Sequence, residues 1–374
     1  MGLLSGVRVI EFEGLGPAPF CGMLLADLGA EVIVVERPGG MNTGAGAIFK
    51  RGKRSIVLDL KNQSAIQIAR DLIASADALI EGLRPGVMER LGLGPDDVRE
   101  KNKKLVYGRL TGWGQDGPLA TAAGHDINYV SLSSAAWYSG VAGEAPLPPP
   151  TLVGDVAGGS LYLAIGILSG IINARVTNIG CVVDAAIVDG SAHMMNLLFS
   201  LRAAGGLPDA RGNSMLDGAH FYAVYKCADA KWISIGALEP KFYADFLARM
   251  GLDDDDRFAS QYDQAQWPVL KSVLAGIFQS KPRAHWDEKF LGTDVCYAPV
   301  LTPEEAAANP HMQARNVFQT VDGVLQTAPA PRFDGKPAEH VKPAPAPGEN
   351  TEAILTELGY DAARITELNT SGVI

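Results

Sequence analysis

One histidine and two carboxylates stand in sequence contexts that permit proton transfer. His125 lies in the charge-poor segment AGHDINY, Asp155 precedes a long uncharged stretch, and Glu239 follows an apolar run and precedes Pro240. A neutral imidazole can accept a proton and a carboxylic acid can deliver one, so a facing pair can serve as general base and general acid. Each residue also has a structural explanation, because a lone histidine is more often structural and an acidic residue at a helix start acts as a cap.

Asp155 is also close to groups that could stabilise negative charge. Gly158 and Gly159 follow it at the start of the uncharged stretch, where the first backbone N–H groups of a helix lack partners within the helix. Such groups can bind an anion or a developing oxyanion. We therefore expect the backbone around Gly158–Ser160 to be able to hold a developing oxyanion beside Asp155.

Basic side chains recur where the predicted strands end. They are Arg37, the run KRGKR at Lys50–Arg54, Lys61, Arg84 and Arg90. In open α/β sheets ligands bind outside the carboxyl ends of the strands, so cations there favour a phosphate-rich ligand. The alternative is that they only solvate surface loops. Residues 1–110 hold 15 Lys/Arg and 13 Asp/Glu, a net of +2, whereas the whole chain carries −10. An anionic ligand should therefore bind the N-terminal part.

Several other ligand classes are not favoured. The net charge of −10 argues against a nucleic-acid or membrane binder. The segment GLGPAPF has Pro19 where a dinucleotide loop needs glycine. The four cysteines have no CxxC spacing, and the acidic run at 253–256 lacks the spacing of a calcium loop, so we expect no metal. Dispersed cysteines and a start unlike a signal peptide predict a cytoplasmic protein.

The elements that must position these residues alternate between strand and helix. Strands are expected at 7–11, 31–36, 55–60, 78–81 and 105–112, and helices at 17–29 and 64–76. Such alternation predicts a parallel sheet covered by helices on both faces, with right-handed crossovers. The predicted fold class is therefore α/β.

The segment Val156–Ala174 has no charged residue in 19 positions, which is long enough for a membrane span. Its glycines dilute the hydrophobicity, and no aromatic or basic belt flanks it. We therefore expect a helix buried on all sides, not a membrane helix. A strand at 181–189 and a helix at 190–204 should follow.

The second half predicts a smaller α+β domain. A Gly- and Asp-rich connection at 207–218 precedes two runs, 222–227 and 232–237, that are typical of an antiparallel hairpin, and three helical stretches follow. Repeated prolines between residues 327 and 350 predict an extended strap over the surface. A short helix is expected at 351–358.

Ordered motifs along most of the chain resemble one known family. They are SGVRVIE, ADLGAEVIVVERP, RGKRSIVLDLK, RPGVMERLGLGP, RLTGWGQDGP, AGHDINY, LVGDVAGGS and VDAAIVDGS, and the likeness continues through GNSMLDGAHFYAVYKCADAKWISIGALEPKFY. Together they resemble the α-methylacyl-CoA racemases within the family III CoA-transferase group. The sequence departs from that family at Asn178–Cys181, where NIGC replaces the common GKGQ, which affects the interactions of that loop and not the catalytic pair.

The resemblance implies an interlocked homodimer whose subunits each have a Rossmann-like large domain and a small α+β domain. In this chain the large CoA-binding domain would be residues 1–205, completed by 330–374. The small domain would be residues 221–312, joined by linkers at 206–220 and 313–329.

The resemblance also implies roles for individual residues. His125 and Asp155 would be the catalytic bases, with Glu239 supporting the site from the small domain of the partner chain. CoA contacts are implied at Arg37, Leu58, Asp59, Leu60, Lys61, Gly82, Leu83, Arg84, Arg90, Gly124, Asp126, Ile127, Asn128 and Tyr129.

The implied reaction is racemisation at the carbon next to a CoA thioester, with the thioester as substrate and no separate cofactor. One base removes the alpha proton and the other delivers a proton to the opposite face. The first alternative is CoA transfer between carboxylic acids, in which Asp155 would become acylated. A non-catalytic acyl-CoA carrier is the second alternative. The acyl chain itself stays open.

Overall fold

Six parallel strands form the sheet of the first half of the chain. The computed structural model describes residues 2–40, 48–336 and 341–374. The strands are β1 (Arg8–Phe12), β2 (Glu31–Glu36), β3 (Arg54–Val57), β4 (Ala78–Glu81), β5 (Val106–Thr111) and β6 (Val182–Ala186). Their order is β3-β2-β1-β4-β5-β6, and every neighbouring pair is parallel. The α/β fold and the parallel sheet predicted from the sequence are confirmed.

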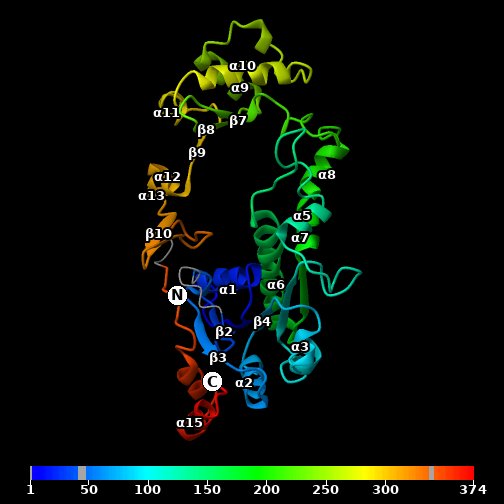
Figure 1. Ribbon diagram of the computed structural model, residues 1–374, viewed down its shortest axis with the longest axis vertical. Coiled ribbons are helices and arrows are strands. Elements are labelled where there is room, and N and C mark those ends of the chain that lie inside the picture. Colours follow the sequence, from blue (N-terminus) through cyan, green and yellow to red (C-terminus); the bar gives the residue numbers. More distant parts are fainter. Residues whose placement is uncertain (1, 41–47, 337–340) are drawn as a thin grey trace. The chain divides into compact units, whose positions relative to one another are not determined.

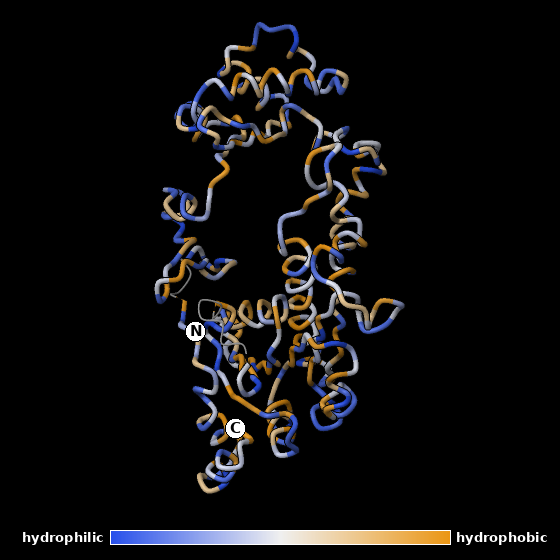
Figure 2. Tube along the Cα trace, in the orientation of Figure 1, coloured by the Kyte–Doolittle hydropathy of each residue, from blue (hydrophilic) through white to orange (hydrophobic). Residues whose placement is uncertain are grey.

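Helices cover both faces of this sheet (Figure 1). The helices α1 (Pro17–Asp27) and α6 (Leu161–Thr177) pack on one face, whereas α2 (Gln63–Ala74), α14 (Thr351–Glu357) and α15 (Ala362–Thr370) pack on the other. Successive side chains of a strand point to opposite faces, so Val9 contributes to the core beneath α1 and Ile10 to the core beneath α2. The strands are accordingly among the most hydrophobic stretches of the trace (Figure 2).

Short helices follow several strands and complete this part of the fold. They are α3 (Val87–Arg90), α4 (Pro95–Arg99), α5 (Asp126–Leu132) and α7 (Ile187–Met194). A π-helix, η2 (Leu152–Ser160), runs directly into α6. Helix α7 begins within the strand predicted at 181–189, because the chain stops pairing with β5 at Ala186.

The uncharged stretch is not buried on all sides, which corrects the expectation from the sequence. One side of α6 packs into the core through Leu163, Ile167 and Ile171, whereas Ile172 and Val176 on another side are 67% and 80% exposed. By length and composition alone, Leu152–Thr177 could cross a membrane. The packing of α6 against strands of the sheet is that of a core helix in an α/β protein.

The chain divides into two compact units, each described here by itself. The first contains residues 1–135, 149–194 and 311–374, and the second contains 136–148 and 195–310. Residues 136–148 and 195–205, which the resemblance assigned to the large domain of residues 1–205, thus group with the second unit.

The second unit is built on an antiparallel sheet of three strands, β7 (Tyr222–Lys226), β8 (Trp232–Gly236) and β9 (Tyr297–Val300). The predicted hairpin is therefore present. Its helices are α8 (Asn196–Ala203), α9 (Pro240–Met250), α10 (Trp267–Gln279), α11 (Arg283–Phe290) and α12 (Pro303–Ala308), with a 3-10 turn η3 at Asp256–Phe258. An aromatic core that includes Phe221, Phe246 and Phe278 holds these elements together.

The C-terminal part returns to the first unit. Helix α13 (Pro310–Ala314) precedes a hairpin of β10 (Phe318–Val321) and β11 (Val324–Thr327), which the sequence did not predict. The N–H of Ser55 in β3 donates to the Asn350 side chain at 2.9 Å, and this contact anchors the start of α14. The sequence predicted α14 but missed α15, whose Leu368 completes the core beneath α2.

Candidate active site

The structure brings His125 and Asp155 together through one intervening carboxylate. His125 is the N-terminal cap residue of α5, where its N–H donates to Asn128 Oδ1 at 3.0 Å and its side chain is exposed. The next residue, Asp126, is buried and accepts a hydrogen bond from the Asp155 N–H at 2.8 Å. This hydrogen bond joins the start of α5 to the π-helix at the residue next to His125.

Asp155 is placed where a carboxylic acid holds its proton to a higher pH than an ordinary aspartate does. Burial, followed by the negative charge of Asp126, raises the pKa of Asp155 to about 6, and His125 acts in the opposite direction. The structural explanation of Asp155 as a cap also fails, because it lies inside the π-helix, which begins after Thr151. The half-buried carboxyl is therefore suited to proton transfer.

The loop after β1 forms part of the same site, which the sequence did not predict. A Cβ added to Gly16 would lie 3.9 Å from Asp155 Oδ2, and the Ser160 hydroxyl donates to the Pro17 carbonyl at 2.7 Å. Gly16 has a φ of +63°, a conformation that other residues adopt only with strain. From the sequence, GLGPAPF was considered only as a dinucleotide loop, and Pro19 argued against that role. The available signal was its position after β1, since ligands of such sheets bind where the strand order reverses, here between β1 and β4.

Aromatic packing fixes the segment that carries His125. The Tyr129 hydroxyl donates to the Gly124 carbonyl, and its ring meets Trp113 edge-on with centroids 4.7 Å apart. A Cβ on Gly112 would overlap the Tyr129 ring, so the TGWG segment after β5 accepts no larger residue there. Gly112 and Trp113 are supporting residues that were not among the predicted site residues.

The predicted oxyanion role of Gly158–Ser160 finds no support in the structure. These three residues are buried in the second half of the π-helix. A Cβ on Gly158 would lie 2.5 Å from Ser191 Oγ, and a Cβ on Gly190 would lie 1.9 Å from the Gly158 carbonyl oxygen. The glycines therefore allow close packing between the π-helix and α7, and this packing explains their presence.

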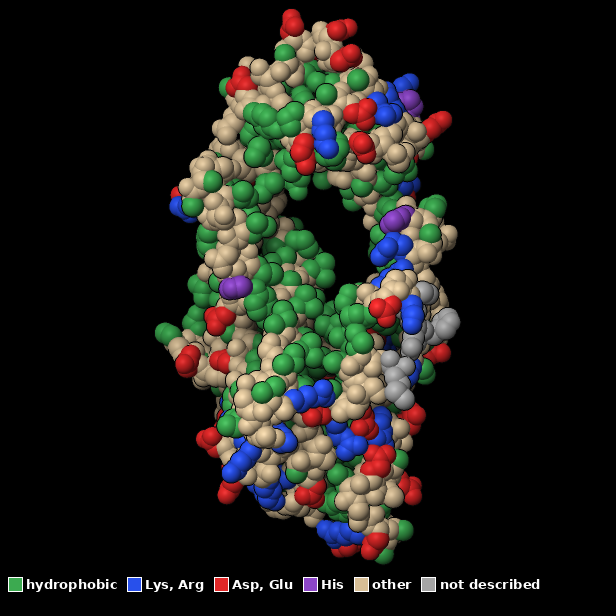
Figure 3. Space-filling model, turned by 180° about the vertical axis from the view of Figure 1, so that it is seen from behind, with side chains coloured by type: hydrophobic (Ala, Val, Ile, Leu, Met, Phe, Trp, Pro, Cys, Tyr) green, Lys and Arg blue, Asp and Glu red, His purple; other side chains and the backbone are tan. Residues whose placement is uncertain are grey.

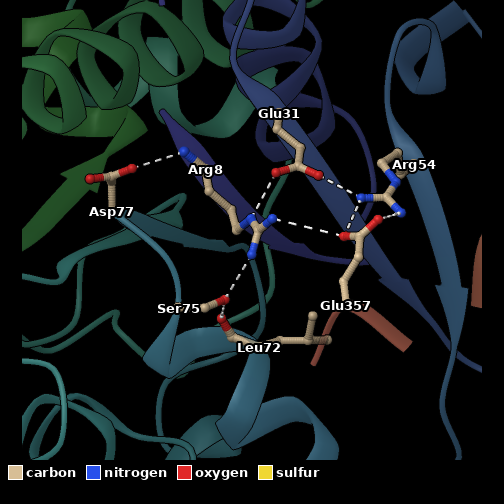
Figure 4. A network of polar contacts seen from close by, with 7 residues as sticks. All are labelled: Arg8, Glu31, Arg54, Leu72, Ser75, Asp77 and Glu357. Atoms are coloured by element: carbon tan, nitrogen blue, oxygen red, sulfur yellow. Dashed lines mark hydrogen bonds and ion pairs between the residues drawn. The ribbon is translucent and has the colours of Figure 1, made fainter. Parts of the chain in front are cut away.

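The basic run Lys50–Arg54 is not available to an anionic ligand, which corrects the prediction for that segment. Lys50 pairs with Glu36, Arg51 with Asp27 at 2.5 Å, and Lys53 with Glu11 at 2.5 Å. Arg54 bridges Glu31 and Glu357, and with Arg8 it forms the network that joins β1, β2, β3 and α14 (Figure 4). Each cation of the run is neutralised by a carboxylate of the fold.

The other predicted cations remain exposed at the carboxyl ends of the strands. Arg37 follows β2 and lies 3.6 Å from Glu13, with 71% of its side chain exposed. Lys61, Arg84 and Arg90 are also exposed, and within the described part of the chain no acidic group lies within ion-pair distance of them. The carboxyl end of the sheet therefore presents exposed positive charge after β2, β3 and β4.

The remaining predicted contact residues fall into two groups. Gly82, Ile127 and Asn128 are exposed, and Asp59, Leu60, Leu83 and Gly124 are partly exposed. Leu58, Asp126 and Tyr129 are buried, so a ligand could reach their backbone more readily than their side chains.

Glu239 belongs to the second unit, at the residue before α9. Its side chain is exposed and makes no capping hydrogen bond, while its carbonyl accepts the N–H groups of Phe242 and Tyr243. The capping explanation considered from the sequence therefore does not account for the glutamate. Its role in the site stays a prediction.

Comparisons with known proteins agree with these features. Residues 4–351 match the family model described as CoA-transferase family III. A mouse (Mus musculus) protein named alpha-methylacyl-CoA racemase is 41% identical over 375 residues, which is 100% of this chain and 97% of that protein. An acetyl-CoA:oxalate CoA-transferase from Acetobacter aceti is 30% identical over 385 residues, covering 97% of each chain. A solved CAIB/BAIF family protein from Brucella suis aligns with a TM-score of 0.83 and 26% identity, over 96% of this chain and 99% of that one. The chain belongs to CoA-transferase family III.

Proposed function

We propose that this protein is a racemase that interconverts (2R)- and (2S)-2-methylacyl-CoA thioesters. The observation that carries the proposal is the half-buried Asp155, whose pKa is raised to about 6 and whose N–H donates to Asp126, the residue next to His125. The full-length likeness to a protein named alpha-methylacyl-CoA racemase supports the same activity. Incubating the protein with 2-methylacyl-CoA esters in deuterated water tests it, because racemisation places deuterium at the alpha carbon.

The mechanism requires His125 and Asp155 to share one exchangeable proton between them. For one enantiomer, neutral His125 removes the alpha proton while protonated Asp155 delivers a proton to the opposite face of the enolate. For the other enantiomer, ionised Asp155 removes the proton and the imidazolium delivers one. Proton transfer alone balances this reaction, so the CoA thioester serves as substrate and the chemistry calls for no further cofactor.

The pH dependence of kcat/KM is expected to be bell-shaped and identical in both directions, because the two productive states are tautomers that carry the same number of protons. Asp126→Asn keeps an oxygen that can accept the Asp155 N–H but removes a charge that raises the Asp155 pKa. The variant should therefore shift the limb of the profile that reports ionisation of Asp155 to lower pH. A profile that Asp126→Asn leaves unchanged would contradict this account of the Asp155 carboxyl.

Binding of CoA is proposed at the exposed cations after β2, β3 and β4, since CoA carries phosphate groups and Arg pairs with phosphate by charge-assisted hydrogen bonds. Replacing both Arg84 and Arg90 with alanine should weaken CoA binding at least about tenfold, measured by calorimetry, without a large loss of stability. The matched control is Lys103→Ala with Lys104→Ala, which removes the same charge from exposed sites just before β5, at the opposite end of the sheet. Equal losses in both double variants would mean that general charge attraction, and not this site, binds CoA.

CoA transfer between carboxylic acids is the second candidate. The likeness to an acetyl-CoA:oxalate CoA-transferase favours it, and a half-buried aspartate beside the Gly16 loop is also suited to nucleophilic attack on a thioester. An acyl group trapped on Asp155, together with CoA appearing on a free acid, would establish transfer instead of racemisation.

Assembly as an interlocked homodimer is proposed together with this function. Hydrophobic side chains gather on the part of the first unit that includes α6 (Figure 3), and Ile165, Ile172 and Val176 of that helix are all at least 60% exposed. Apolar surface of this kind marks a protein contact, and a second copy of the chain would cover it. Sedimentation at several protein concentrations tests the dimer, and a monomer at every concentration would overturn it. A cytoplasmic location remains part of the proposal.

A further inference from the structure

A buried arginine joins the two ends of the segment that presents two of the exposed cations. Arg109 lies on β5 and is 7% exposed. Its Nε donates to Glu81 Oε1 at 2.8 Å, while Nη1 and Nη2 donate to the two carboxylate oxygens of Glu89 at 2.8 and 3.3 Å. A guanidinium that binds two carboxylates in fixed geometry restrains both of them.

The two carboxylates stand at the ends of the connection from β4 to α3. Glu81 is the last residue of β4, and its second oxygen accepts the Leu83 N–H at 2.7 Å. Glu89 belongs to α3 and directly precedes Arg90. Arg84 lies between these anchors. One guanidinium therefore fixes the beginning and the end of the segment that carries Arg84 and Arg90.

The same contacts decide the charge that a ligand meets there. Glu81 and Glu89 together would cancel the positive charge of Arg84 and Arg90. Arg109 neutralises part of that acidic charge from inside the fold, so the exposed edge keeps a net attraction for an anion.

We propose that Arg109 is a positioning residue of the CoA site, which holds residues 82–90 in shape and shields Arg84 and Arg90 from two neighbouring carboxylates. This inference rests on the proposed acyl-CoA substrate. Arg109 itself is buried and does not need to touch the ligand. It acts only through Glu81 and Glu89, so its removal should affect binding of CoA much more than proton transfer at the remote thioester end.

The experiment compares steady-state kinetics of Arg109→Gln, Arg109→Lys and the wild-type protein. Arg109→Gln should raise KM for the acyl-CoA at least about tenfold while kcat stays within about twofold, because it removes an interaction common to ground state and transition state. Arg109→Lys keeps the charge but not the hydrogen bonds to both carboxylates. Its KM should therefore lie between the KM of Arg109→Gln and that of the wild-type protein. If Arg109→Gln does not fold, Arg109→Lys alone decides the role: it keeps the charge, but a single ammonium cannot hold both carboxylates in the same fixed geometry, so KM should still rise.

The matched control is Arg99→Gln. Arg99 is half-buried in α4, and its Nη2 donates to the Gly180 carbonyl at 2.9 Å, with no carboxylate partner in the described residues. Its loss should lower stability without changing KM. A wild-type KM in the Arg109 variants, or an equal rise in KM for Arg99→Gln, would overturn the proposal.

Failure of the racemase proposal would be visible separately. If the wild-type protein exchanges no alpha proton, the affinity of CoA itself, measured by calorimetry with the same variants, still decides the role of Arg109. Weaker CoA binding in Arg109→Gln but not in Arg99→Gln would support the positioning role, and equal affinities would reject it.

Discussion

Asp155→Asn is expected to abolish racemisation, lowering kcat by about 10³-fold or more, because general acid–base groups contribute on that scale. The amide can neither deliver nor accept the proton, while its size and its place in the π-helix are retained. The measurement is the rate of interconversion of the two enantiomers of a 2-methylacyl-CoA, followed together with deuterium uptake at the alpha carbon.

His125→Ala should have an effect of the same size, and the double variant should be little worse than either single one, since the two residues act as a unit. Slow deuterium uptake into one enantiomer can survive in each single variant, because the remaining base still faces one side of the alpha carbon. Asp96→Asn, an exposed carboxylate in α4, serves as the control and should retain wild-type rates. Racemisation that persists without Asp155 would exclude it as one of the bases.

Mixing two inactive variants is expected to restore activity if each site is shared between chains. Glu239→Ala and Asp155→Ala should each be inactive when alone. In a mixed dimer, one site would contain both substitutions and the other would contain neither. Half of randomly paired dimers are mixed and half of their sites are intact, so about a quarter of wild-type activity should return after refolding the mixture.

The outcome of the mixing experiment depends on proof that mixed dimers form. Differently tagged chains that co-purify provide that proof. If tagged mixed dimers form and the mixture stays inactive, Glu239 acts within its own chain or has no role in the site. Activity in Glu239→Ala alone would show that this glutamate is not required for the reaction.

Much of the fold could be predicted because it depends on local patterns. Short β-branched runs alternating with helical apolar spacing indicated a parallel sheet, and β1 shows why this works. Its neighbouring residues Val9 and Ile10 are both apolar because each faces a different layer of helices. The position of Arg84 and Arg90 at the carboxyl edge of the sheet followed from the same pattern, because side chains just after parallel strands must lie at one edge.

The helix α6 marks the limit of that reasoning. Its sequence is apolar around its whole circumference, so composition alone predicted burial on every side. Only the tertiary structure separates the side that packs on the sheet from the side that carries exposed Ile172 and Val176. The pattern of apolar residues does not show which side of such a helix packs against the sheet and which side stays exposed.

The candidate site combines both kinds of information. The residue types and motif contexts made His125 and Asp155 candidates from the sequence alone. The hydrogen bond from the Asp155 N–H to Asp126, the position of Gly16 beside the Asp155 carboxyl and the pairing of every cation in Lys50–Arg54 were decided only by the tertiary structure. The physical reason is that the pKa of a carboxyl and the availability of a cation depend on the charges and the burial around them, and partners such as Lys53 and Glu11 lie 42 residues apart until the sheet brings them together.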